Sequence, residues 1–157
     1  MEKYIQPFIK VCQAVFRDFC QTEVTPGRVF FVEREEFRKD WDISGIIGLS
    51  GEVKGAVVIS LKTASATKIA GILTGTVHKH LDADVADAVG EIVNIISGNV
   101  KKDLENTFRI IISLPTIVKG AVHSAIWPSE KPRIICIPFS LFKDHEMCLS
   151  VAIDLNK

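Results

Sequence analysis

Residues 90–102, GEIVNIISGNVKK, form the centre of an amphipathic pattern that runs from residue 82 to residue 106 and predicts a long helix. At about 100° per residue, the apolar side chains of this segment fall on one side of such a helix. They are Val89, Ile92, Val93, Ile96, Val100 and Leu104. The other side carries Asp87, Glu91, Asn94, Gly98, Lys101 and Glu105. We therefore predict that Asn94, whose residue type is a poor former of helix interiors, lies on an exposed face opposite a buried one.

The segments on either side of this helix predict a mixture of helices and strands. A second amphipathic helix is expected over residues 1–20, with Pro7 in its first turn, where a missing N–H costs little. A short helix is expected with Thr63 or Ser65 as its N-cap and Gly75 as its stop. Strands are expected at residues 28–33, 46–51, 56–61, 108–115, 133–140 and 146–155.

The order of these elements predicts the fold class. Glycines within residues 46–61 supply the backbone freedom of a hairpin, and the charged segment 33–42 is expected to be an exposed loop. No regular element is assigned to residues 116–132. We predict an α+β fold in which long helices pack on a largely antiparallel sheet, with residues 1–157 forming a single domain.

The composition limits the partners and the compartment. The 19 basic and 19 acidic residues cancel, so no net field favours nucleic acid or an anionic membrane. The amino-terminal segment does not resemble a signal peptide, and no uncharged apolar run is long enough to span a membrane. Four separated cysteines are expected to be buried free thiols in a reducing compartment, which favours a cytoplasmic protein. They are Cys12, Cys20, Cys136 and Cys148.

Histidine is the usual acid–base group and metal ligand, but the histidines of this chain form no ligand cluster with cysteine or aspartate in the sequence. Each is expected to lie on the surface. They are His78, His80, His123 and His145. We therefore expect no metal site of the chain's own.

The exposed helix face carries side chains that can act on a partner. Glu91 and Asn94, at positions i and i+3, lie next to each other, with Asp87 one turn before them. A carboxylate can bind a partner's cation, while a carboxamide offers both donors and an acceptor that can orient a water. Gly98, one turn beyond Asn94, leaves this face without a side chain. The sequence therefore predicts a groove there into which the backbone of a partner could fit. An ordinary solvated helix face is the alternative interpretation of these residues.

These residues resemble a known family. Asp87, Glu91, Asn94 and Gly98, followed by ISLP ending at Pro115, are similar to the signature of the CheC/CheX/FliY family of chemotaxis phosphatases. The segments YIQPFI and GLSGEVKGAVVISL resemble the opening helix and the glycine-bearing strand pair of that family, although Gln6 replaces its usual Asn. The resemblance extends from about residue 4 to residue 153 and is closest to the CheX branch, which carries a single signature.

The resemblance implies an activity and a partner. Similar proteins dephosphorylate the aspartyl phosphate of the response regulator CheY, with an Asn that orients water and a Glu that pairs with a lysine of the regulator. These catalytic roles fall on Asn94 and Glu91. Contacts with the partner are expected for Asp87, Gly98, Lys101 and Pro115. The Mg²⁺ ion would belong to the regulator, so no cofactor of the chain's own is implied.

The resemblance also implies a homodimer, which exposed strand edges among residues 108–154 would permit. A second signature is not expected, because Lys68 and Gly71 stand where Glu and Asn would be needed. Two other functions remain open at this point. The chain could be a non-catalytic adaptor that binds a phosphorylated regulator, or a structural subunit such as a flagellar switch component.

Overall fold

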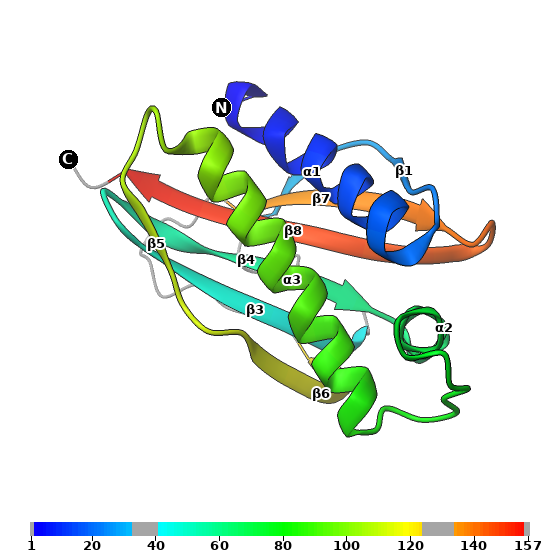
Figure 1. Cartoon of the computed structure of the whole chain (residues 1–157). Coiled ribbons are helices and arrows are strands. Elements are labelled where there is room, and N and C mark those ends of the chain that lie inside the picture. Colours follow the sequence, from blue (N-terminus) through cyan, green and yellow to red (C-terminus); the bar gives the residue numbers. More distant parts are fainter. Residues whose placement is uncertain (1, 33–40, 124–133, 156–157) are drawn as a thin grey trace.

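The computed structural model describes residues 2–32, 41–123 and 134–155, which form helices packed on an antiparallel sheet (Figure 1). The helices are α1 (Glu2–Cys20), α2 (Thr63–Thr74) and α3 (Ala83–Leu104). The strands are β1 (Thr25–Pro26), β2 (Phe30–Val32), β3 (Trp41–Gly51), β4 (Val53–Leu61), β5 (Ile110–Ile112), β6 (Thr116–His123), β7 (Ile134–Leu141) and β8 (His145–Leu155).

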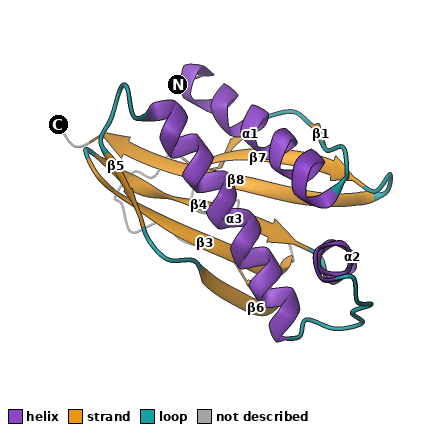
Figure 2. Cartoon of the chain, viewed as in Figure 1, coloured by secondary structure: helices purple, strands orange, loops and turns teal. Residues whose placement is uncertain are grey.

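The strand order of the described sheet is β1-β7-β8-β4-β3-β5, with β2 also paired to β7 and β6 also paired to β3. All of these pairings are antiparallel. Figure 2 shows the three helices on the same side of the sheet, with α3 crossing it obliquely. The predicted α+β class, with helices on an antiparallel sheet, is confirmed.

The centre of the sheet is the predicted hairpin, which is longer than the apolar pattern indicated. Strands β3 and β4 pair from Ile43 opposite Leu61 to Leu49 opposite Gly55. Gly51 ends β3 with a φ of 105°, in the left-handed region that favours glycine. Glu52 then fixes the turn to the segment before β5, because its backbone N–H donates to the Arg109 carbonyl (2.9 Å) and its carboxylate accepts from the Arg109 N–H (2.6 Å).

Gly55 is the position in this hairpin where we expect a substitution to be most damaging. A Cβ at residue 55 would overlap the carbonyl oxygen of Ala152 in β8, and β4 cannot move away because it is also paired to β3. Gly55→Ala is therefore expected to lower the free energy of unfolding by about 3 kcal/mol. Chemical denaturation would measure this change. Gly71→Ala, in a helix where the added Cβ would meet its nearest neighbour at 3.4 Å, should not reproduce the loss.

Helix α1 buries the apolar stripe that its sequence predicted, with two differences. Ile5, Phe8, Cys12, Val15 and Phe16 are buried against the rest of the core, whereas Phe19 is 50% exposed. Pro7 lies inside the helix and not in its first turn, because the helix begins at Glu2, five residues before the proline. The carboxyl end of α1 therefore leaves an aromatic ring partly in solvent.

The four cysteines are buried thiols that are not joined in disulfides, as predicted. Burial raises the pKa of the Cys20 thiol to about 11, and burial, followed by the nearby Cys20, raises the pKa of the Cys12 thiol further still. These two thiols stay protonated at neutral pH. They are core side chains and not nucleophiles.

The start of α2 differs from the prediction. Its N-cap residue is Lys62, whose side chain makes no capping hydrogen bond, and not Thr63 or Ser65. The cap comes from Asp42, whose carboxylate accepts from the backbone N–H (2.7 Å) and the hydroxyl (2.9 Å) of Thr63. The backbone hydrogen bond from Thr63 is the main cause of the lowered pKa of Asp42. The predicted stop at Gly75 is confirmed, with a φ of 71°.

Two segments differ from the loops expected in the sequence. Trp41 and Asp42, which we assigned to a charged loop, begin β3. The rest of that loop, residues 33–40, lies outside the described residues. The segment 116–132, to which no element was assigned, begins with strand β6, which pairs with β3 from Ile46 opposite Thr116 to Trp41 opposite His123. Residues 124–133 lie outside the described part of the chain.

Candidate active site

Helix α3 has the two faces that its sequence predicts. All six predicted core residues are buried: Val89, Ile92, Val93, Ile96, Val100 and Leu104. On the opposite face Asp87, Glu91 and Glu105 are exposed, while Asn94, Gly98 and Lys101 are half-buried. The buried face therefore holds the helix on the core, and Glu91 and Asn94 lie on the side available to a partner.

A close contact with β3 fixes the middle of the helix. A Cβ at Gly45 would lie 3.0 Å and 3.2 Å from the Cγ1 atoms of Val93 and Val89, so the glycine allows this turn of α3 to lie close to the sheet. Such close packing leaves the helix backbone little room to move, and this also limits movement of the opposite face. Glu91 and Asn94 belong to the same two turns of α3. Their backbone positions are therefore well defined.

Pro115 lies beside the same part of α3. A Cβ at Gly90 would lie 3.7 Å and 3.8 Å from Cγ and Cβ of Pro115, and 3.5 Å from Cδ1 of Ile117. The corner between β5 and β6 thus approaches the helix one residue before Glu91. Pro115, which is distant in the sequence, therefore lies against the residue that precedes Glu91 and stands one turn before Asn94.

The remaining predicted contacts extend along the helix. Asp87 lies one turn toward the amino end, and Lys101, which forms an ion pair with Glu105 at 3.6 Å, lies near the carboxyl end. A Cβ added at Gly98 would find no heavy atom within 4 Å. The surface is therefore open at Gly98, next to the turn that carries Asn94.

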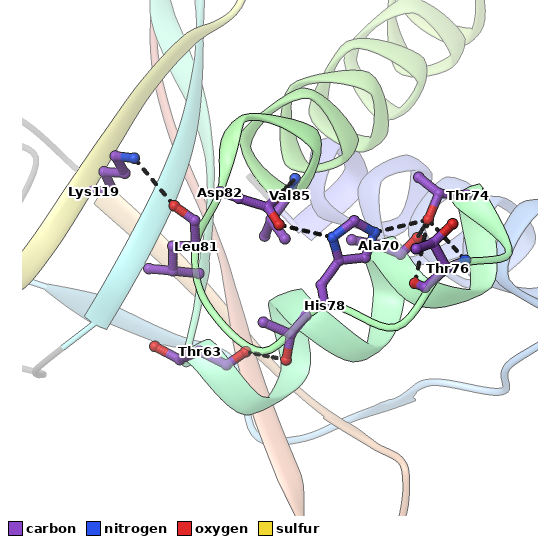
Figure 3. Close-up of polar contacts among 10 residues, drawn as sticks. Thr63, Ala70, Thr74, Thr76, His78, Leu81, Asp82, Val85 and Lys119 are labelled. Carbon is purple, nitrogen blue, oxygen red and sulfur yellow. Dashed lines mark hydrogen bonds and ion pairs between the residues drawn. The ribbon is translucent and has the colours of Figure 1, made fainter.

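A polar network fixes the start of α3 and includes His78, for which the prediction of a surface position was wrong (Figure 3). The imidazole is only 4% exposed, with Nδ1 2.9 Å from a carboxylate oxygen of Asp82 and Nε2 2.8 Å from the Thr74 hydroxyl. Asp82 is the N-cap of α3 and also accepts from the Val85 N–H at 2.9 Å. These hydrogen bonds lower the pKa of Asp82, and the one with His78 contributes most.

The same network contains a group of metal-ligating side chains that the sequence did not indicate. Ligand atoms of His78, Asp82 and Asp84 all lie within 4.8 Å of one another. Both ring nitrogens of His78 already have hydrogen-bond partners, in Asp82 and Thr74. We therefore interpret the group as a structural link between α2 and α3.

The other histidines also differ in their surroundings. His123 is half-buried, with Nε2 2.7 Å from the Ser44 hydroxyl and Nδ1 2.9 Å from the Gly120 carbonyl oxygen. His145 is half-buried against the ring of Phe142, while His80 is exposed as predicted. The way the chain folds around each imidazole, and not the polarity of the segment, decides which of them are covered.

An apolar cavity lies at the far end of the helical layer. Its volume is about 240 Å³, and Tyr4 is the one described residue of its lining with a polar group in the side chain. It is lined by Tyr4, Ile5, Phe8, Val53, Leu104, Phe108, Ile110, Ile135, Ile137, Val151 and Ile153. It therefore offers no acid–base pair or nucleophile, and the exposed face of α3 remains the better candidate for chemistry. None of the described helices is long and apolar enough to cross a membrane.

Comparison with known proteins identifies the family of the chain. The family model for the chemotaxis phosphatase CheX matches residues 43–140, a segment that contains Glu91, Asn94 and Pro115. CheY-P phosphatase CheX of Thermotoga maritima is 24% identical over 110 residues, which are 69% of this chain and 69% of that protein.

Solved structures of similar proteins share the whole fold. Chemotaxis protein CheX from Vibrio vulnificus is 27% identical, with a TM-score of 0.86 over 97% of this chain and 99% of the other. The CheX–CheY–BeF3–Mg²⁺ complex from Borrelia burgdorferi matches at 25% identity and a TM-score of 0.80, over 96% of this chain and 97% of the matched one. Because the family model covers more than half of the sequence, the chain belongs to the chemotaxis phosphatase CheX family.

Proposed function

We propose that this chain hydrolyses the aspartyl phosphate of phosphorylated CheY and so ends the signal that this response regulator carries. The observation that carries the proposal is the position of Glu91 and Asn94 on the open face of a helix whose other face is locked to the sheet. The relative from Thermotoga maritima is a CheY-P phosphatase, and the similar Borrelia burgdorferi structure contains CheY bound to CheX.

Asn94 is proposed to orient the attacking water. Its carboxamide oxygen can accept a hydrogen bond from the water, while its N–H₂ group donates one to a phosphoryl oxygen. These two bonds would place the water oxygen in line with the scissile bond. The water oxygen bonds to phosphorus as the bond between phosphorus and the aspartyl oxygen breaks, so phosphate leaves and the carboxylate of the regulator is restored. Phosphoryl transfer depends mainly on such positioning and on charge stabilisation, so a strong base on this chain is not required.

Glu91 is proposed to dock the helix by pairing with a lysine of the regulator. Since Glu91 lies at i−3 from Asn94, its carboxylate can hold a cation beside the same phosphoryl group. Asp87, Lys101 and Pro115 extend this contact surface along α3 and onto the β5–β6 corner. The Borrelia burgdorferi complex contains Mg²⁺ together with CheY, which supports a metal supplied by the regulator. That this chain holds no metal of its own is part of the proposal.

The proposed function also implies a compartment and an assembly for the chain. Buried thiols fit a reducing compartment, and we assign the chain to the cytoplasm, as expected for a partner of a chemotaxis regulator. In the described sheet β6 is hydrogen-bonded on one side, to β3, and its other edge can pair with a second copy. We therefore keep the homodimer as a proposal, to be measured by light scattering of the purified chain.

Gly98 should show opposite effects on stability and on activity. Gly98→Ala is expected to raise the free energy of unfolding by up to about 1 kcal/mol, because alanine is the better helix former and the added Cβ meets open space. The same methyl group should raise the half-saturation concentration for phosphorylated CheY, if a backbone of the partner approaches there. Denaturation and phosphate-release assays would measure the two effects. Gly71→Ala in α2 is the matched control, and equal activity of both variants would contradict the proposed contact.

The proposed function is tested by phosphate release from purified phosphorylated CheY, with and without the wild-type chain. Release should become faster in proportion to the amount of chain added. Binding of the regulator without any acceleration would support the adaptor function, and absence of both binding and acceleration would support a purely structural subunit.

A further inference from the structure

The corner between β5 and β6 presents a leucine to solvent beside the proposed active face. Leu114 is 87% exposed, the highest value among the large apolar side chains that the structure describes. Exposed apolar side chains are common singly on protein surfaces, so exposure alone identifies no site. Leu114 differs from such residues in how its backbone is held and in what it adjoins.

Hydrogen bonds hold the corner to the central hairpin. The Ser113 N–H donates to the Gly48 carbonyl oxygen (2.9 Å), and the Gly48 N–H donates to the Ser113 hydroxyl oxygen (2.8 Å). The Ser113 hydroxyl in turn donates to the carbonyl oxygen of Leu114 (2.8 Å). The backbone that carries Leu114 is therefore attached to β3 and is not a loose loop.

Pro115 holds the other side of the corner. Its ring restricts φ and packs at Gly90 of α3, as described above. Because Leu114 stands between two fixed residues, its main chain has little freedom to lose when a partner binds. Burial of an apolar side chain on an ordered backbone contributes more to affinity than burial of one on a mobile loop, because less conformational entropy is lost on binding.

The corner is continuous with the proposed contact surface. Gly90, which Pro115 contacts, directly precedes Glu91 in α3, and the β5–β6 connection runs beside this helix in Figure 1. A regulator seated over Glu91 and Asn94 would lie next to the corner that carries Leu114. Interfaces commonly combine a few buried anchors with surrounding polar contacts, and a rigid exposed aliphatic side chain is suited to such a role.

We propose that Leu114 is an apolar anchor for the phosphorylated regulator, at the edge of the contact surface around Glu91 and Asn94. The proposal rests on the proposed function and adds a specificity residue to it. Leu114 contacts no reacting atom, so it strengthens ground-state and transition-state binding equally. Its loss should then raise the half-saturation concentration and leave turnover at saturation unchanged.

The test compares three substitutions at Leu114 with one at Val77, which is 84% exposed in the loop after α2. Binding is measured with CheY activated by beryllofluoride and Mg²⁺, and turnover by phosphate release from phosphorylated CheY. Leu114→Ala is expected to weaken binding about tenfold, equivalent to about 1.4 kcal/mol. Leu114→Met should stay within about twofold of wild type, Leu114→Gln should resemble Leu114→Ala, and Val77→Ala should change nothing.

Equal affinity of Leu114→Ala and wild type would overturn the anchor, as would an equal loss in Val77→Ala. So would a loss in Leu114→Ala and Leu114→Gln that follows a fall in their melting temperature, because the leucine would then be structural. The proposed function fails separately, when wild-type chain binds activated CheY and does not accelerate phosphate release. In that case the affinities of the Leu114 and Val77 variants for activated CheY still test whether Leu114 is an anchor.

Discussion

Asn94→Ala is expected to slow phosphate release from phosphorylated CheY by at least about 100-fold, to near the rate without the chain. The reason is that the carboxamide positions the attacking water, and loss of alignment at the reacting atoms affects the transition state far more than the bound state. Affinity for beryllofluoride-activated CheY should stay within about threefold of wild type, because the docking contacts remain. Single-turnover phosphate release together with a binding titration would measure both quantities.

Asn99→Ala is the matched control for this substitution. It removes the same side chain from the same helix, five residues farther on, where the wheel places it off the Glu91–Asn94 stripe. It should leave release unchanged. If Asn94→Ala lost binding to the same extent as activity, Asn94 would be part of the docking surface and not the residue that orients water.

Glu91→Ala is expected to raise the half-saturation concentration for phosphorylated CheY by about 10- to 100-fold. Removing one partner of a charge-assisted hydrogen bond costs about 1.5–3 kcal/mol, and the lysine of the regulator would lose its counter-charge. The loss should be smaller at high salt, because salt already screens part of this interaction in the wild-type complex. Phosphate release measured over a range of regulator concentrations, at two salt concentrations, would show both effects.

Two variants separate the charge of Glu91 from its size and from general surface effects. Glu91→Gln keeps the shape and removes the charge, so it should behave like Glu91→Ala. Asp103→Ala removes a carboxylate from an exposed position of the same helix, where the wheel places it off the Glu91–Asn94 stripe, and should leave the half-saturation concentration close to wild type. An unchanged binding curve for Glu91→Ala would contradict the proposed pairing with lysine.

Local periodicity explains why so much of the site could be predicted. The buried and exposed faces of α3 follow from side-chain spacing on one helix, so the positions of Val89, Glu91 and Asn94 needed no information from distant residues. The β3–β4 hairpin was predictable for a similar reason, since its strands are adjacent in the chain and its turn needs a glycine at Gly51. The stop of α2 at Gly75 is equally local.

Two of the errors come from contacts with distant segments, and the third comes from the fold of a short loop. Strand β6 has a weak local pattern, and it is a strand because β3, a distant segment of the chain, supplies its hydrogen-bond partners. The cap of α2 comes from Asp42, 21 residues before Thr63. His78 is covered because the chain between α2 and α3 folds it between Thr74 and Asp82, which the polarity of that loop did not indicate.

The helices, the central hairpin and the face of α3 that carries Glu91 and Asn94 could be predicted from the sequence alone, because each depends on neighbours within a few residues. The distant segments that adjoin that face could be identified only in the folded chain. The Ser113–Pro115 corner lies beside Gly90 because β5 and β6 both pair with β3, and β3 is the strand on which α3 packs at Gly45. Such contacts depend on the path of the chain through space, and the spacing of side chains along one element gives no information about that path.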